Sequence, residues 1–254
     1  MDSKELIVRV LGDKVESYSR VQGGKDSTVW KVSCSDNKQY ALRVLPVNRH
    51  HQFVQEKYVM QLAADHGIPV PKIHQVECIE SFTIMLADWL PGRTVFEEIL
   101  SNPGQVDTIG YEFGKVHARI HAIKGFDVSW RDWFTAENET EQELKMQIAT
   151  SMPTHDVLLH LDYHPLNVTT DGTNITGVID WINASTGDFR YDVARTLSIL
   201  RTEAPKLIEA TTLEVFEEAW RSGYESVNGE IGDVDLFLKW ADVRMERDNL
   251  ERDA

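Results

Sequence analysis

The segment His160-Leu161-Asp162-Tyr163-His164-Pro165-Leu166-Asn167 places an aspartate five residues before an asparagine. Transfer of a phosphoryl group to a hydroxyl uses a carboxylate that accepts the hydroxyl's proton. It also uses a nearby oxygen ligand that fixes a magnesium ion on the nucleotide phosphates. We therefore predict that Asp162 is a catalytic base and that Asn167 is a metal ligand.

A second aspartate, Asp180, follows Asn167 by thirteen residues, directly after Gly177-Val178-Ile179. The β-type segments 166–170 and 175–179, separated by the turn Asp171-Gly172-Thr173-Asn174, predict a hairpin that returns Asp180 to the side of Asn167. A carboxylate there supplies the hard oxygen ligand that magnesium prefers. Taken singly, each aspartate could merely cap a turn; their order and spacing favour the metal site.

A glycine-rich turn near the N-terminus is a candidate for phosphate binding, because glycines let backbone N–H groups approach phosphate oxygens closely. A plain hairpin turn accounts for the same glycine pair. The candidate nucleotide-binding residues are Gly23, Gly24, Ser27, Thr28 and Val29.

Ala41 and Arg43 lie on one face of the next β-type segment, and Glu56 follows on a predicted helix. Arginine binds phosphate oxygens through two parallel hydrogen bonds, and Glu56 could pair with it and hold it in place. The alternative is that Arg43 is an ordinary solvent-facing strand residue.

Two regions of different pattern must position these residues. Before Leu90-Pro91-Gly92 we expect helices at 3–11 and 48–66 and β-type segments at 17–21, 28–34, 40–45, 72–76 and 82–87. After it, helical spacing dominates at 95–100, 106–123, 140–148, 191–201, 213–227 and 234–250. We therefore predict an α+β protein of two lobes, residues 1–88 and 89–254.

The composition limits the class of protein. With 26 basic against 41 acidic residues the formal charge is −15, which disfavours binding to nucleic acid or to an anionic membrane. The chain has neither a signal-like start nor an apolar run long enough to span a bilayer, so we expect a cytoplasmic protein. Cys34 and Cys78 are expected to be reduced, buried thiols.

The motifs resemble those of the aminoglycoside phosphotransferase and choline kinase-like family, relatives of the protein kinases. The similarity spans residues 15–200. It is carried by residues 23–29, 40–45, 53–56, 67–71, 85–92, 160–167, 177–181 and 187–194. It implies a protein kinase-like fold, with a small antiparallel-sheet N-lobe carrying one main helix and a larger, mostly helical C-lobe.

The resemblance also implies ATP, or alternatively GTP, together with Mg²⁺. The adenine would lie near Val29 and Ala41 and meet the backbone of Ala87 and Trp89, with Leu86 as gatekeeper. It further implies that three residues brace the site without being catalytic, namely His160, Asp188 and Asp192. Two positions depart from the common pattern: Leu161 stands where many members have glycine, and Arg43 where many have lysine.

The acceptor is the least determined part of the prediction. Acidic residues are available in the last helices and would suit a cationic aminoglycoside; solvated helix faces explain them equally. They are Glu214, Glu217, Glu218, Asp233, Asp235 and Asp242. An antibiotic-type hydroxyl acceptor is our first hypothesis, and choline, a sugar or a homoserine-like alcohol is the second. The oligomeric state is left open.

Two other classes of function are weighed against the enzyme. A pseudokinase would bind nucleotide without turnover, but such proteins often lose the set Asp162, Asn167 and Asp180, which is intact here. A zinc site could use His117 and His121, four residues apart on a predicted helix, but the His-Glu-x-x-His pattern of zinc hydrolases is missing from this helix.

Overall fold

The computed structural model describes residues 3–21, 27–126, 128, 133–150 and 156–253. The predicted phosphate-binding residues Gly23 and Gly24 lie outside the described residues. The chain divides into two compact units, and we describe each by itself. The first consists of Met1–Gln61 and Pro71–Leu90, and the second of Leu62–Val70 and Pro91–Ala254.

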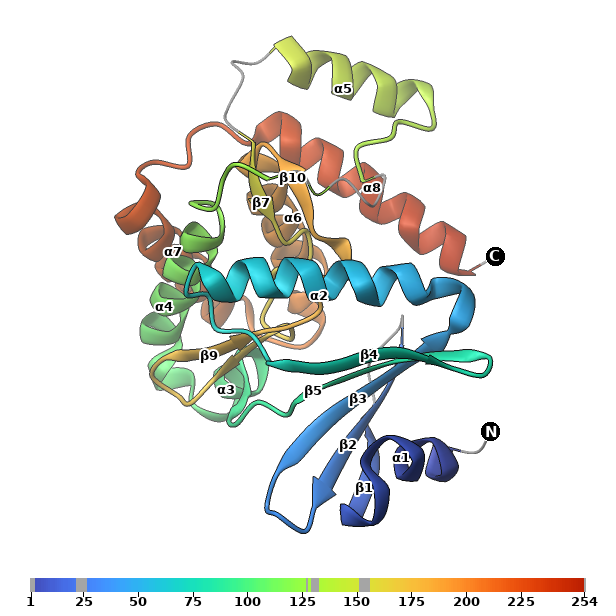
Figure 1. The fold of residues 1–254 in the computed structure, drawn as a ribbon. Helices are drawn as coiled ribbons and strands as arrows, with labels where there is room; N and C mark the ends of the chain where they lie inside the picture. The colour runs from blue at the N-terminus through green and yellow to red at the C-terminus, as the bar shows by residue number, and fades with distance from the viewer. Residues whose placement is uncertain (1–2, 22–26, 127, 129–132, 151–155, 254) are drawn as a thin grey trace. The chain divides into compact units, whose positions relative to one another are not determined.

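The first unit contains a five-stranded antiparallel sheet with the strand order β1-β2-β3-β5-β4 (Figure 1). Its strands are β1 (Val15–Val21), β2 (Thr28–Cys34), β3 (Gln39–Pro46), β4 (Ile73–Ile79) and β5 (Phe82–Asp88). Helix α1 (Ser3–Leu11) turns Leu6 and Ile7 into a core with Val32, Leu42 and Ile84 of the sheet. The β-type segments predicted from the sequence therefore correspond to the strands of this layer.

Helix α2 (His50–Asp65) follows β3, as the helical spacing predicted. Its residue Phe53 is fully buried and packs with Leu45 and Met85, which lie on neighbouring strands of the sheet. This packing fixes the face of α2 that carries Glu56, which is one helical turn further along. The helix and the sheet together set the position of Glu56 relative to β3.

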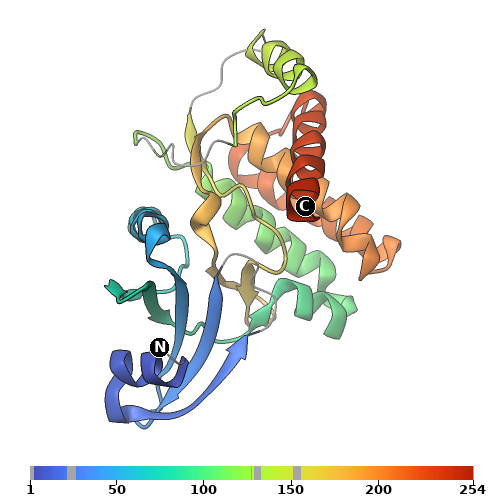
Figure 2. The same ribbon diagram turned by 90° about the vertical axis from the view of Figure 1, so that its right-hand side faces the viewer.

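The second unit is mostly helical. Its helices are α3 (Val95–Ser101), α4 (Val106–Ile120), α5 (Glu139–Thr150), α6 (Phe189–Thr202), α7 (Ala210–Asn228) and α8 (Asp235–Asp253). Helices α4 and α7 lie side by side (Figure 2). They approach closely through two glycines: a Cβ atom at Gly114 would lie 2.0 Å from the carbonyl oxygen of Trp220, and one at Gly223 would lie 2.0 Å from that of Tyr111.

Short strands interrupt the helices. Strands β6 (Arg93–Thr94), β8 (Val168–Thr170) and β9 (Ile175–Val178) form one antiparallel sheet, in which β8 and β9 are the predicted hairpin. Strands β7 (Val157–Leu159) and β10 (Ser185–Gly187) form a second antiparallel pair. The sequence analysis did not predict this pair, because segments of three residues are too short to show a periodic pattern.

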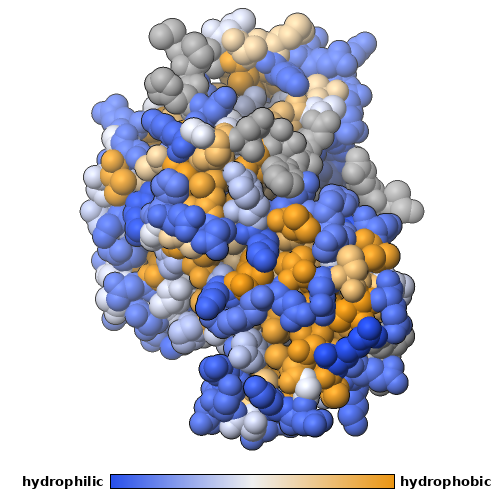
Figure 3. Space-filling view, in the orientation of Figure 1, coloured by the Kyte–Doolittle hydropathy of each residue, from blue (hydrophilic) through white to orange (hydrophobic). Residues whose placement is uncertain are grey.

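Figure 3 shows hydrophilic residues over much of one face, while hydrophobic residues gather on the first unit between α1 and β4.

The structure also bears on two expectations from the sequence, the state of the cysteines and the lack of a membrane-spanning segment. Both cysteines are free, but the prediction that both are buried is wrong: Cys34 is buried and Cys78 is exposed, because Cys78 lies on the opposite face of β4 from its buried neighbour Ile79. In the part of the chain that the structure describes, no helix is both long and apolar enough to cross a membrane.

Candidate active site

The β8–β9 hairpin brings the two predicted metal ligands together. Val168 and Val178 are register partners, and the N–H of Ile179 donates to the carbonyl oxygen of Asn167 at 2.9 Å. Asp180, the next residue, therefore lies beside Asn167. Its backbone has a φ of 63° and a ψ of 60°, a left-handed conformation that is uncommon for aspartate and marks a constrained position.

His160 joins the loop that carries Asp162 to this hairpin. The backbone N–H of Asp162 donates to Nδ1 of His160 at 3.2 Å, so the imidazole proton is on Nε2, which donates to the carbonyl oxygen of Ile179 at 3.0 Å. The ring is fully buried, and burial lowers the pKa of His160, which keeps it neutral. One neutral histidine thus links the residue before Asp180 to Asp162.

The carboxylate of Asp162 is held by side chains on its own loop. Nδ2 of Asn167 donates to the carbonyl oxygen of Asp162 at 3.1 Å and to its Oδ2 at 3.2 Å, while Nε2 of His164 lies 3.6 Å from Oδ1. Burial would raise the pKa of Asp162, but the interaction with the nearby His164 and the charge of Arg195 outweigh it, and the pKa falls to about 2. Asp162 is therefore ionised at neutral pH.

Asp192 on α6 is fully buried and holds the start of the same loop. Its Oδ2 accepts the N–H of His160 at 2.6 Å, and its Oδ1 accepts the N–H of Leu161 at 2.9 Å. Burial would raise the pKa of Asp192, but His117 on α4 and His121, which directly follows this helix, more than offset it, so the pKa falls well below its usual range. A permanently charged carboxylate therefore fixes two backbone N–H groups of the loop.

The three residues His117, His121 and Asp192 also have the spacing of metal ligands, since their candidate ligand atoms all lie within 4.8 Å of one another. Their hydrogen bonds argue against a metal. The indole N–H of Trp220 occupies Nδ1 of His117 at 3.3 Å, and Asp192 already accepts two backbone N–H groups. Because Nδ1 of His117 accepts this bond, the proton of the neutral ring is on Nε2, the nitrogen that faces Asp192 at 3.4 Å and would have to bind the metal. The group is better described as a hydrogen-bonded support of the loop.

Asp188 begins helix α6. Its Oδ1 accepts the backbone N–H of Arg190 at 3.0 Å, and its carboxylate forms a two-pronged ion pair with the Arg190 guanidinium, in which Nη2 donates to Oδ2 at 2.6 Å. The guanidinium lies over the ring of Phe237 on α8, 4.4 Å from its centroid. Asp188 therefore fixes the N-terminus of the helix that carries Asp192, and its contacts are those of a structural residue.

The predicted phosphate-binding cation lies in the first unit. The guanidinium of Arg43 forms an ion pair with the fully buried carboxylate of Glu56, its Nε donates to Oγ of Ser27 at 3.3 Å, and it lies 5.4 Å from the centroid of the Phe53 ring. The alternative of a solvent-facing Arg43 is therefore wrong, since its side chain is only 14% exposed.

The remaining nucleotide-binding candidates lie on three adjacent strands. The register partners are Thr28 with Val44, Val29 with Arg43, Ala41 with Ala87, and Leu42 with Leu86. The N–H of Trp89, which the resemblance assigns to the adenine, donates to the carbonyl oxygen of Gln39 at 3.0 Å. A nucleotide that uses this donor has to displace the Gln39 bond.

Two residues near Asp162 were not assigned a role from the sequence. His164 lies two residues after Asp162, a position that could have suggested a contact with the carboxylate. Arg195 lies on α6, three residues after Asp192. Its influence on Asp162 depends on the packing of α6 against the loop, so the sequence carries no local signal for it.

Comparison with known proteins points in one direction. A model of the phosphotransferase enzyme family matches residues 17–229. Hygromycin-B 4-O-kinase of Escherichia coli is 24% identical over 215 residues, which are 72% of this chain and 59% of that protein. The chain thus spans less than two thirds of this relative's length.

Solved structures show the same fold. Amicoumacin kinase hAmiN, determined in complex with AMP-PNP, Ca²⁺ and its ligand Ami, has a TM-score of 0.72 at 17% identity, covering 96% of this chain and 85% of that one. A type VIII aminoglycoside-3'-phosphotransferase has a TM-score of 0.68 at 17% identity, covering 95% and 98%. The predicted kinase-like fold is confirmed.

Proposed function

Because this chain belongs to the phosphotransferase enzyme family, we propose that it transfers the γ-phosphate of ATP to a hydroxyl group of a small molecule. The observation that carries the proposal is the grouping of Asp162, Asn167 and Asp180 around one hairpin, with the supporting hydrogen bonds of a catalytic loop. ATP is the first choice of donor because hAmiN was crystallised with an ATP analogue, and GTP is the alternative.

The candidate metal ligands fit Mg²⁺. The carboxylate of Asp180 and the amide oxygen of Asn167 are hard oxygen donors, and the amide nitrogen of Asn167 is already directed at Asp162. When bound, the metal would neutralise charge on the nucleotide phosphates. Arg43, held by Glu56, would bind phosphate oxygens from the first unit.

Asp162 acts on the acceptor. Its carboxylate accepts a hydrogen bond from the acceptor hydroxyl and orients the oxygen toward the γ-phosphorus. As the new O–P bond forms and the bond to ADP breaks, the hydroxyl proton passes to Asp162. A pKa of about 2 makes this carboxylate a weak base. The proton therefore moves late, which suits a loose phosphoryl-transfer transition state.

Two acceptor classes are proposed. The relatives named above support an antibiotic-type acceptor. The predicted acidic wall has weaker support, because Glu217 is paired with Arg201 and Asp242 accepts a hydrogen bond from Ser198. A metabolic alcohol, such as choline, a sugar or a homoserine-like alcohol, is the second candidate.

An ATP-consumption screen tests the reaction. Purified protein with ATP and Mg²⁺ is assayed against aminoglycosides, macrolides, amino alcohols and sugars, beside the variants Asp162→Asn and Asp180→Asn. We expect acceptor-dependent ADP release that falls at least about 100-fold in Asp162→Asn, the scale typical of a positioned general base. Tight ATP binding without turnover of any acceptor would indicate a pseudokinase and contradict the proposal.

A further inference from the structure

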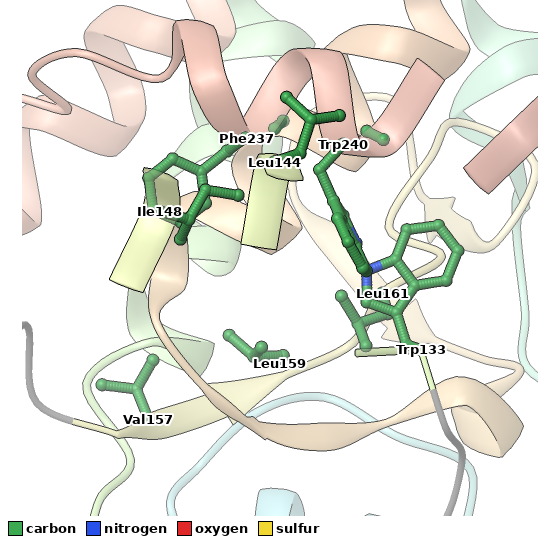
Figure 4. Packing of buried hydrophobic residues seen from close by; sticks show 10 residues of the cluster. Trp133, Leu144, Ile148, Val157, Leu159, Leu161, Phe237 and Trp240 are labelled. Atoms are coloured by element: carbon green, nitrogen blue, oxygen red, sulfur yellow. The ribbon is translucent and has the colours of Figure 1, made fainter. Parts of the chain in front are cut away.

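A group of buried hydrogen-bond donors lies next to the catalytic loop, within the second unit. Trp133 and Trp240 are 8% and 1% exposed and pack with Leu161 in one hydrophobic cluster (Figure 4). Arg244 follows Trp240 by four residues and so lies on the same face of α8. Its guanidinium is 5.2 Å from the centroid of the Trp133 ring, and that of Arg195 on α6 is 4.6 Å from it.

The protein does not satisfy these donors. Within the described residues, the indole nitrogens of Trp133 and Trp240 and the Nε and Nη1 atoms of Arg244 are buried and have no hydrogen-bond partner. Arg244 forms an ion pair with Asp248 on the same helix, but Nη2 lies 3.6 Å from Oδ1, which is longer than a hydrogen bond. We call Trp133, Trp240 and Arg244 the donor cluster.

The chemistry of the donor cluster is one-sided. Indole N–H and guanidinium groups donate hydrogen bonds and accept none. Buried donors without acceptors destabilise a fold, and the donors of a buried guanidinium do so most. Proteins retain such groups where a ligand completes them. The complement of two indole N–H groups and a guanidinium is a negatively charged oxygen group.

The position of the donor cluster fits the acceptor of the proposed reaction. Leu161, which packs against both indoles, directly precedes Asp162 in the chain. Arg195, which stacks on Trp133, lies on α6 three residues after Asp192, whose carboxylate holds the N–H groups of His160 and Leu161 in the same loop. A molecule held by the donor cluster would therefore present its other groups close to the catalytic carboxylate.

We propose that the donor cluster is an acceptor subsite, which binds a carboxylate or phosphate group of the same small molecule whose hydroxyl is phosphorylated. This inference rests on the proposed function. An ammonium group is a poor occupant, because it brings only further donors and a like charge beside Arg244 and Arg195. The subsite therefore selects an anionic hydroxy compound over a polycationic aminoglycoside.

The test compares acceptors that differ in one group. Glucose, glucuronate and glucose 6-phosphate share a hydroxylated ring and differ in the oxyanion; glycerol, glycerate and glycerol phosphate form a second series, and kanamycin is the cationic comparison. ATP consumption is measured at constant ionic strength. We expect turnover to be concentrated among the carboxylate or the phosphate members, and the two arms identify which oxyanion is bound.

Variants connect the selectivity to the donor cluster. Arg244→Gln removes the charge, and Trp240→Phe removes one N–H while keeping an aromatic ring. We expect each to raise the KM of the anionic acceptor while leaving the KM of ATP unchanged. For Arg244→Gln the increase is about 10- to 100-fold, the loss expected for hydrogen bonds to a charged group. Arg221→Gln removes an arginine of α7, loosely paired with Glu217 at 4.0 Å, and serves as the control.

A neutral or cationic molecule as the best acceptor, or an unchanged acceptor KM in both donor-cluster variants, would overturn the inference while leaving the phosphotransferase function intact. If the proposed function itself is wrong, no acceptor will cause ATP consumption. In that case the subsite is tested by the increase in melting temperature that glucuronate or inorganic phosphate produces. Stabilisation of the wild type but not of Arg244→Gln supports the subsite, and equal or no stabilisation refutes it.

Discussion

Leu161 has a backbone φ of 57°, in the left-handed region, yet its side chain is 1% exposed and packs in the core. The left-handed conformation costs a residue with a Cβ about 1–2 kcal/mol. Its N–H must nevertheless reach Oδ1 of Asp192, so the backbone cannot relax without losing that bond. The structure therefore predicts that this leucine carries conformational strain that its burial offsets.

A pair of substitutions separates the two contributions. Leu161→Ala keeps the Cβ and loses packing, at about 2–5 kcal/mol. Leu161→Gly loses a further methyl group, about 0.8 kcal/mol, and gains chain freedom in the unfolded state, about 0.5–1 kcal/mol, but relieves the strain. Since the relief of about 1–2 kcal/mol cancels the extra losses, we expect the two variants to be equally stable within roughly 0.5 kcal/mol.

Leu159 provides the matched control. It is fully buried in the same cluster and lies in strand β7, and it is not among the described residues with positive φ. There the glycine variant should be less stable than the alanine variant by about 1.5 kcal/mol. Urea unfolding followed by tryptophan fluorescence measures all four variants. If the glycine variant is less stable than the alanine variant by the same free energy of unfolding at both positions, Leu161 is not strained.

Three other predictions concern the supports of the site. Breaking the Arg43–Glu56 pair with Arg43→Met should cost about 3 kcal/mol, because it leaves a buried charge, and adding Glu56→Met should recover most of it in a double-mutant cycle of urea midpoints. Burial is the main reason that the pKa of His117 is lowered from 6.5 to about 4. As the pH falls, this histidine therefore becomes protonated in the unfolded chain before it does so in the folded protein. Stability should drop by about 2 kcal/mol from pH 6.5 to pH 5, and the drop should be smaller in His117→Asn. Gly114→Ala should lower the melting temperature severely because its Cβ meets backbone of α7, whereas Gly104→Ala, whose Cβ meets nothing within 4 Å, should not.

The sequence predicted the elements and the hairpin well, for a physical reason. The apolar spacing of the long helices and the turn Asp171–Asn174 are local signals, and the side chain of Asp171 accepts the N–H groups of Thr173 and Asn174 as that turn requires. Asp162, Asn167 and Asp180 could be brought together on paper because a short hairpin fixes its own register. The Arg43–Glu56 pair, in contrast, was expected from the likeness of residues 41–43 to the phosphate-binding strand of kinases rather than from a local signal.

Contacts between distant segments could not be predicted. The sequence analysis treated His117 and His121 as a zinc candidate, but their role depends on Asp192, more than seventy residues later, and on Trp220 of α7. The donor cluster likewise draws on α8 and on the segment before α5. No periodicity connects such residues, because their distances are set by helix packing. The exposure of Cys78 depended on which face of β4 was covered by the core.

The departure of Leu161 from the family's common glycine connects these observations. A glycine would meet the backbone requirement at no cost in strain, but it would leave nothing between the loop and the two indoles. With leucine, the residue whose N–H is held by Asp192 also packs against Trp133 and Trp240. The loop is thus fixed on one side by a buried carboxylate and on the other by the proposed acceptor subsite. A ligand bound in that subsite should therefore order the loop. Leu161→Gly should reduce this effect of the ligand on the loop more than it reduces the stability of the fold.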